Sequence, residues 1–466
     1  MTQYSNGRTN LASQNNMAAA TLIICVGVIT AVFLLPADNP NATFNTAALI
    51  VGLVLAVALV VEAQGGLRVL LRTDILMLVA LYGLTLLEFL FPQPDFSHLV
   101  LPESAVIGTQ AVLYGFAGIA IGRHLVSPLP SATTAINRRY LSPKTLFNVF
   151  LGLFILGYLY IFLSVNFDLW EMLQQMTYSR FSQAWSRGRI GGWVSLLTEL
   201  GLLIYLLPPI AGVVLARWEE FSTGQKLVVF TVLALTLFYG FSGGTRSIFI
   251  THLLTFASGY LLFKKNLKTW QIVGYGAVFA VLAGIAVFLM LEFRTTGLAN
   301  YSVSERKTET LFVDNNIIVI SRLTDVFPSK SDYLGLEIPF NALIRPIPRA
   351  LWLGKPEGLS TGIEEALGAE GLTLAATFVG ESYMSGGLFA VIIASVLLGV
   401  AAGWWNRRGQ DLDSDFNLLL YVSGFFAAAL SMRSILQVVP ALLPTIALWV
   451  YGRTRFLKLV RSQAPL

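Results

Sequence analysis

The chain has 466 residues, of which 55% are hydrophobic and only 12% are charged, and its mean hydropathy is +0.69. This composition excludes a soluble globular protein, because a water-exposed surface needs more charged residues, and it indicates that lipid is the main solvent. The formal net charge is +5, but the basic residues fall in short loops rather than in one patch, which argues against nucleic acid as a partner.

From the N-terminus onward, apolar runs recur that are long enough to cross about 30 Å of hydrocarbon. The first run is longer than a signal-peptide core and lacks a cleavage pattern, so we expect a retained helix. The twelve runs lie at residues 17–35, 45–62, 74–91, 105–122, 146–165, 194–216, 226–241, 247–263, 271–292, 383–404, 416–431 and 436–452. The seventh and eighth are separated by only a few residues, so the sequence allows either a tight helical hairpin or one broken helix.

Lysine and arginine mark the short loops that stay in the cytoplasm. They alternate along this chain with loops that have almost none, which predicts that both termini are cytoplasmic. We therefore expect an all-α polytopic membrane protein of about 12 transmembrane helices with one large extracytoplasmic loop. Residues 1–292 hold helices 1–9, residues 293–382 form the long periplasmic loop, and residues 383–466 hold helices 10–12 and a cytoplasmic tail.

A set of arginines departs from this rule, because each falls on the predicted outer side. They are Arg180, Arg187, Arg189, Arg246, Arg294, Arg345, Arg349 and Arg433. So many cations on the side that disfavours them indicate a function at the outer face.

Arg246 follows Gly243, Gly244 and Thr245. Two glycines allow a sharp turn that exposes N–H groups at the start of the next helix beside a guanidinium, and such a helix start favours phosphate. A plain helical turn with a snorkelling arginine explains the same residues about as well.

Residues 177–193 interleave aromatic side chains, among them Tyr178, with Arg180 and Arg187. Aromatic rings bind the faces of sugars, and arginine forks bind diphosphate oxygens in pairs. An interfacial amphipathic helix that rests on lipid headgroups fits this segment equally well, and the two interpretations are compatible.

In the long loop, residues 344–358 are rich in proline and carry Arg345, Arg349 and Trp352. Prolines fix the backbone, so the segment predicts either a rigid arginine-bearing turn or a plain connector. Farther on, Glu381 begins the tenth apolar helix and is a candidate general base. The alternative is a charge that satisfies the N-terminus of that helix.

We expect no metal and no cofactor. The single cysteine, Cys25, lies in the first apolar run, and the three histidines are scattered over different segments without metal-ligand spacing. No Walker loop, Rossmann glycine pattern or serine-nucleophile elbow is present in the sequence.

The order of these elements resembles the Wzy-type O-antigen polymerases and the wider family of oligosaccharide repeat-unit polymerases. The matching marks are the turn at 243–246, Arg294 before the long loop, the Pro-x-x-Leu-Trp segment at 348–356 and the glycine-rich entry at 380–387. The resemblance covers roughly residues 170–390. Residues 353–355 are Leu-Gly-Lys where relatives often have Pro-Gly-Lys or Pro-Asp-Lys, so the cation is retained.

The resemblance implies a bacterial inner-membrane glycosyltransferase that joins undecaprenyl-diphosphate-linked oligosaccharide units on the periplasmic side and releases undecaprenyl diphosphate. Membrane lipids and a chain-length regulator protein are the other partners that it implies. For this chemistry we expect Arg246 and Glu381 to act in catalysis. The residues expected to bind substrate are Arg180, Arg187, Arg294, Arg345, Arg349, Tyr178 and Trp352.

Two other functions compete with this one. An O-antigen ligase uses the same donor and transfers the chain to lipid A core, but such ligases usually carry a histidine in the large outer loop, and residues 295–380 contain none. A flippase for lipid-linked oligosaccharide needs cations along a cavity at bilayer depth, whereas the interiors of these apolar runs are nearly free of charge. A structural scaffold leaves the outer arginines unexplained.

Overall fold

The structure is a computed structural model. It describes residues 2–126, 141–179, 182–186, 195–244, 246–264, 267–293, 297–300, 315–347, 349, 351–356, 358–369, 374–410 and 414–462. Within these ranges the regular secondary structure is helical, and 11 helical segments are long and apolar enough to cross a membrane. The chain is therefore an all-α, multi-pass membrane protein, as its composition predicts.

The spanning helices follow the apolar runs of the sequence. They are α1 (Thr2–Leu34), α2 (Pro40–Ala63), α4 (Pro102–Gly122), α5 (Pro143–Ser164), α7 (Ser195–Leu200) continued through η4 (Gly201–Leu206) into α8 (Leu207–Ala216), α9 (Thr223–Ser242), α10 (Arg246–Phe263), α11 (Thr269–Phe293), α15 (Thr377–Asn406), α16 (Asp415–Arg433) and α17 (Val438–Ser462). The shorter helices are η1 (Leu67–Leu70), α3 (Thr73–Thr85), η2 (Leu87–Leu90), α6 (Leu169–Met176), η5 (Trp218–Glu220), η6 (Leu298–Asn300), α12 (Asn316–Val326), α13 (Glu337–Ile344), α14 (Ile363–Ala366), η8 (Arg407–Gln410) and η9 (Ile435–Gln437).

The third apolar run forms a shorter helix than the sequence predicts. Helix α3 has 13 residues, which at 1.5 Å per residue reach only about 20 Å, and it gives way to η2 after Leu86. Helix α12, from the predicted loop, packs against α3 and α4, and its Asn316 amide donates to the Leu84 carbonyl oxygen at 2.7 Å. A helix supplied from far along the chain therefore completes the packing above α3.

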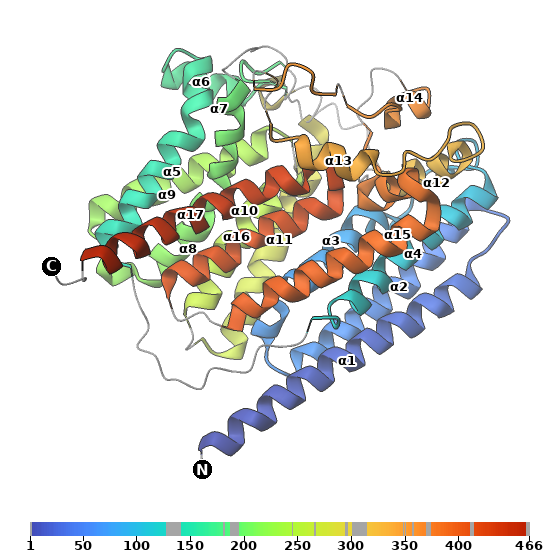
Figure 1. The fold of residues 1–466 in the computed structure, drawn as a ribbon, viewed down its shortest axis with the longest axis horizontal. Coiled ribbons are helices and arrows are strands. Elements are labelled where there is room, and N and C mark those ends of the chain that lie inside the picture. Colours follow the sequence, from blue (N-terminus) through green and yellow to red (C-terminus); the bar gives the residue numbers. More distant parts are fainter. Residues whose placement is uncertain are drawn as a thin grey trace.

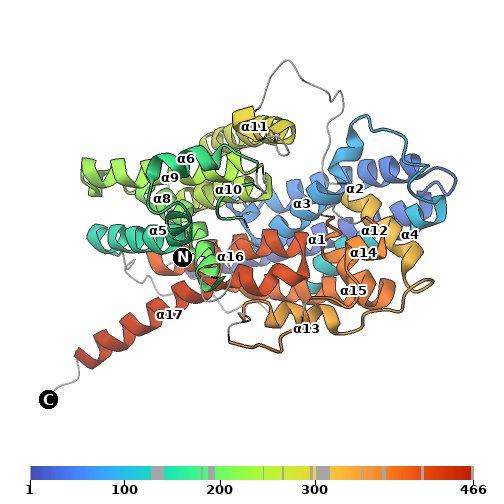
Figure 2. The same ribbon diagram turned by 90° about the horizontal axis from the view of Figure 1, so that it is seen from above.

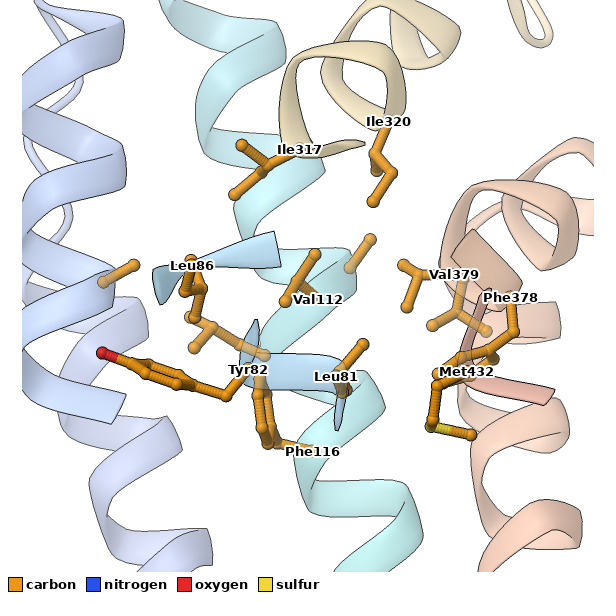
Figure 3. Close-up of a cluster of buried hydrophobic side chains, with 14 of the residues drawn as sticks. Leu81, Tyr82, Leu86, Val112, Phe116, Ile317, Ile320, Phe378, Val379 and Met432 are labelled. Carbon is orange, nitrogen blue, oxygen red and sulfur yellow. The ribbon is translucent and has the colours of Figure 1, made fainter. Parts of the chain in front are cut away.

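Helix α12 is buried although it belongs to the segment expected to lie outside the membrane. Ile317 and Ile320 are fully buried, and Figure 3 shows them beside Val112 of α4 and Leu86. The long segment between α11 and α15 thus contributes α12 to the core.

The seventh and eighth apolar runs form a hairpin rather than one broken helix. Helix α9 begins with a capping box between Ser222 and Gln225 and ends at Gly243. Gly244 has φ of +62°, a left-handed conformation that favours glycine, and α10 then packs back against α9. The turn places Arg246 at the first residue of α10.

Two large hydrophobic cores hold most of the buried apolar residues in the part of the chain that the structure describes. One is built from α1–α4, α12 and α15, and the other mainly from α5, α8, α9 and α16. Figures 1 and 2 show α16 between the two groups of helices, and it packs against α3, α15, α10 and α17. Its C-terminus therefore lies where the two halves of the bundle meet.

The two ends of the bundle differ. Helices α6, α7, α13 and α14 gather at the top of Figure 1, opposite the N-terminus. We call this the upper end, and it also holds the starts of α10 and α15. The lower end holds the C-terminus of α4 and the chain between α2 and α3.

A buried ion-pair network lies at the lower end. Arg123 contacts Glu62 at 2.7 Å and Asp74 at 2.9 Å, and Arg72 pairs with the same two carboxylates. Arg123 also donates to Thr21 of α1 at 2.7 Å. These arginines, which the sequence indicates only as markers of orientation, therefore also fasten α1, α2, α3 and α4 together.

Candidate functional site

A break in α15 shapes the upper end. Gly387 has φ of +66°, and a Cβ there would lie 2.7 Å from the Tyr333 hydroxyl, so both the backbone and the space require glycine. The break separates residues 377–385 from the spanning remainder of α15. The carbonyl groups of Met384 and Ser385 accept backbone hydrogen bonds from Leu334 and Gly335 at 2.8 and 3.0 Å. Broken helices whose backbone groups are satisfied in this way mark binding sites in membrane proteins.

Glu381 lies in the short segment before this break and is 4% exposed. Its carboxylate accepts hydrogen bonds from the Ser434 hydroxyl at 2.5 Å and from the N–H groups of Ile435 and Leu436 at 2.5 and 3.3 Å. These groups open η9, where a helix start leaves N–H donors without intrahelical partners. Glu381 therefore satisfies the N-terminus of η9 and not that of its own helix.

The same geometry bears on the predicted role of Glu381 as a base. A carboxylate has about four acceptor positions, and three are occupied here. Proton transfer to Glu381 stays a prediction, whereas its anchoring of the chain between α16 and α17 is observed.

Residues at the end of α16 connect the glycine turn before Arg246 to Glu381 and its hydrogen-bond partners, which we call the Glu381 anchor. Arg246 is buried at the start of α10, and the hydroxyl of the next residue, Ser247, accepts from the Arg433 guanidinium at 3.0 Å. Arg433 ends α16 and directly precedes Ser434, which donates to Glu381. A continuous chain of contacts therefore joins the turn before α10 to the short segment of α15.

Among the arginines in this chain of contacts, Arg433 is the one that was not expected at the site from the sequence. Its only signal was a position on the predicted outer side, which it shared with seven other arginines. Nothing in the sequence shows that residue 433 meets residue 247.

The long loop brings a third element to the anchor. Helix α13 packs against η9 and α15, and Arg345 at its C-terminus lies within electrostatic range of Glu381. The Lys355 ammonium donates to the backbone carbonyls of Arg345 at 3.1 Å and Ile347 at 2.8 Å. Lys355 therefore closes the proline-rich turn over the C-terminus of α13.

The other two predicted residues of this turn face outward. Arg349 is exposed and donates from its guanidinium to the Pro356 carbonyl at 3.2 Å. The Trp352 side chain is 37% exposed, and the backbone N–H of Trp352 donates to the Arg349 carbonyl at 3.1 Å. The turn thus has internal hydrogen bonds of its own, which makes it more than a plain connector.

Several cations lie in this part of the upper end. We call Arg246, Arg345, Arg349, Lys355 and Arg433 the upper cation cluster. Partial burial lowers the pKa of Lys355, and the nearby Arg349 and Arg345 lower it further, while Glu199 of α7 acts in the opposite direction. An anion placed among these cations would relieve their mutual repulsion.

Tyr178 belongs to a neighbouring part of the upper end. It follows α6, and its hydroxyl accepts from the Gln174 amide at 3.0 Å. The N–H of Ala299, in the segment after α11, donates to the Thr177 carbonyl at 3.0 Å. The structure thus joins the chain after α6 to the chain after α11, the two places where the sequence predicts arginines for substrate. Arg180, Arg187 and Arg294 themselves lie outside the described residues.

In the part of the chain that the structure describes, no group of three or more His, Cys, Asp or Glu side chains is arranged to hold a metal ion. Comparison with known proteins finds no family model, no curated protein and no solved structure that matches the chain.

Proposed function

We propose that the chain is a surface-polysaccharide polymerase of the O-antigen type, located in a bacterial inner membrane. It joins undecaprenyl-diphosphate-linked oligosaccharide repeat units and releases undecaprenyl diphosphate. One observation carries the proposal: three separate elements bring arginines to the upper end near Glu381. Arg345, at the C-terminus of α13, lies within electrostatic range of Glu381. Arg433 of α16 precedes the Ser434 that donates to Glu381, and it donates to Ser247, the residue after Arg246 of α10. The resemblance to repeat-unit polymerases stated above supports the same conclusion.

The chemistry of the reaction explains why such a site needs cations. The bond from the anomeric carbon of the growing chain to the diphosphate oxygen breaks, and the electron pair leaves with the diphosphate. A hydroxyl oxygen of the incoming unit forms the new bond, and its proton passes to a base. Arginine forks bind the diphosphate in pairs and stabilise the charge that develops on it. Two such contacts supply roughly 3–5 kcal/mol, which corresponds to a rate factor of about a thousand.

The proposed topology follows the basic loops. The upper end faces the periplasm, and both termini are cytoplasmic, because the lysine-rich and arginine-rich short loops gather toward the lower end. In this arrangement the cation cluster meets the outer leaflet, where lipid-linked repeat units await polymerisation. Tyr178, Trp352, Arg180, Arg187 and Arg294 are the proposed sugar and diphosphate contacts beyond the cluster.

Replacement of Arg246 by Ala tests this function in the organism that encodes the chain. Surface polysaccharide is compared by gel with the wild type, a deletion strain and an Arg453→Ala control, which removes an exposed arginine at the far end of α17. We expect Arg246→Ala to reduce the ladder to core plus one repeat unit, while Arg453→Ala keeps it. A normal ladder removes Arg246 from the site, and complete loss of antigen with normal protein levels indicates a ligase or flippase instead.

A further inference from the structure

Helix α13 exposes an apolar side although it is short and peripheral. Leu336 is 82% exposed, Leu343 is 65% exposed, and Phe340 and Ile347 are exposed as well. Their spacing of four, three and four residues puts them on one side of the helix and its flanks. The opposite side is apolar too, because Ile338 and Ala342 are buried against the bundle.

Helix α13 lies beside a spanning helix that also exposes apolar side chains. Helix α13 packs against α15, and Figure 2 shows it at the edge of the molecule beside α15. Just past the glycine break, the spanning part of α15 exposes Phe389 and then Ile393 and Leu397 at helical spacing. Leu334 and Gly335, which hydrogen-bond to the break, lead directly into α13 and fix its position against α15.

A group of cations lies beyond the C-terminus of α13. Arg345, Arg349 and Lys355 follow its C-terminus, whereas Glu337 at its start is held by the Ser360 hydroxyl at 2.7 Å. An apolar stripe that ends in a group of cations is the pattern of a helix that lies in a membrane interface with its cations at the level of the phosphates.

We propose that α13 is an interfacial helix whose exposed side lies in the hydrocarbon of the upper leaflet. The anion that binds the upper cation cluster is then a phosphate or diphosphate carried by a membrane lipid, and not a soluble nucleotide sugar. The position of α13 stands independently of the polymerase reaction. The identity of the ligand rests on that proposed function, which already names a lipid-linked donor, and the inference adds that this donor arrives within the leaflet beside α13.

The position of α13 is tested by nitroxide labels at single cysteines. The only native cysteine is replaced in a Cys25→Ser background, and labels are placed at Leu343→Cys, at Phe389→Cys as the lipid reference and at Lys330→Cys as an exposed reference in the same loop segment. The protein is reconstituted in vesicles of phosphatidylethanolamine and phosphatidylglycerol without substrate. Relaxation by dioxygen, which concentrates in lipid, is compared with relaxation by a water-soluble nickel chelate.

We expect position 343 to match position 389, with strong relaxation by dioxygen and weak relaxation by nickel, and position 330 to show the reverse. A label at 343 that behaves like the one at 330 would place α13 in water and overturn the proposal. Protection from both reagents would show that protein covers this face, as a second copy of the chain would, and would overturn it equally. None of these results depends on catalysis.

The ligand is tested by thermal unfolding of the purified protein. We expect a polyprenyl diphosphate to raise the Tm by at least about 2 °C, the shift that a ligand well above its Kd produces. Inorganic diphosphate at the same concentration should raise it less, and Leu343→Glu should reduce the difference between the two. Equal shifts from both ligands would refute a lipid-borne anion. A polyprenyl effect without turnover would leave this inference standing and would contradict the proposed polymerase.

Discussion

Removal of the Glu381 carboxylate should loosen the junction between α15, α16 and α17. Glu381→Ala leaves the Ser434 hydroxyl and the N–H groups of Ile435 and Leu436 without their acceptor. A buried N–H without an acceptor costs about 1–3 kcal/mol, and two N–H groups lose their acceptor here. We therefore expect a loss of about 4 kcal/mol, which is roughly a 4 °C fall in Tm for a chain of this length.

Glu381→Gln should preserve most of this anchoring. The amide oxygen can accept from the two backbone N–H groups, and the amide N–H₂ can donate to the Ser434 hydroxyl, which also serves as an acceptor. The expected loss is about 1 kcal/mol. Product formation in this folded variant should stay within about tenfold of the wild type if Glu381 positions the arginines, since proton transfer contributes 10²–10⁴-fold where a residue serves as the base.

The assay is thermal unfolding of the purified protein in detergent, with Glu219→Ala as the control because Glu219 is an exposed carboxylate at the lower end. The control should change stability by less than about 0.5 kcal/mol. The reasoning is refuted if Glu381→Ala is as stable as the wild type, or if Glu381→Gln is as unstable as Glu381→Ala.

Three further predictions follow from the packing. Arg123→Ala should destabilise the protein by about 3–5 kcal/mol, because it leaves two carboxylates buried at the lower end; a loss below about 1 kcal/mol in thermal unfolding would contradict this. Gly387→Ala should lower the free energy of unfolding by about 1–3 kcal/mol, because residue 387 has a positive φ and a Cβ there would meet the Tyr333 hydroxyl. Adding Tyr333→Phe should recover part of that loss. The control Gly274→Ala, at a helical position with open space, should be neutral or stabilising. Lys355→Met should open the turn after α13 and weaken the Tm rise given by a polyprenyl diphosphate, and an unchanged rise would exclude Lys355 from the site.

The spanning helices could be predicted from hydropathy because each apolar run is long enough to cross a bilayer by itself. The length of the helix in the third run could not be predicted from hydropathy. Helix α3 is short, and α12, formed by residues 316–326, packs against it. A run of apolar residues does not record whether its outer end meets lipid or another part of the chain. The same limit applies to α12, whose burial is decided by tertiary packing.

The separate parts of the candidate site could be predicted from the sequence, but the contacts between them could not. The glycine turn at Arg246, the turn that carries Arg345 and the carboxylate Glu381 each had a local signature. Their meeting depends on Arg433 and Ser434, which have no local signature and act through contacts with Ser247 and Glu381. Because these residues lie far from Ser247 and Glu381 in the sequence, their contacts could not be predicted from it.

The lower end shows a related limit of topology rules. Arg72 and Arg123 fit the excess of cations expected in cytoplasmic loops, yet both are engaged with buried carboxylates. Their location has a structural cause in addition to any role in orientation. A cation count alone cannot separate these two causes.

Turnover by the purified protein in vesicles tests the central claim most directly. Undecaprenyl-diphosphate-linked repeat units are supplied as the only substrate, and the lengths of the lipid-linked products and the released undecaprenyl diphosphate are measured. We predict products of two or more units from the wild type and from Arg453→Ala, and at least a hundredfold slower release from Arg345→Ala, since loss of one charge-stabilising contact costs about 10²–10³ in rate. An intact wild-type protein that leaves the units unjoined, or an Arg345→Ala variant that joins them at the wild-type rate, would contradict the account.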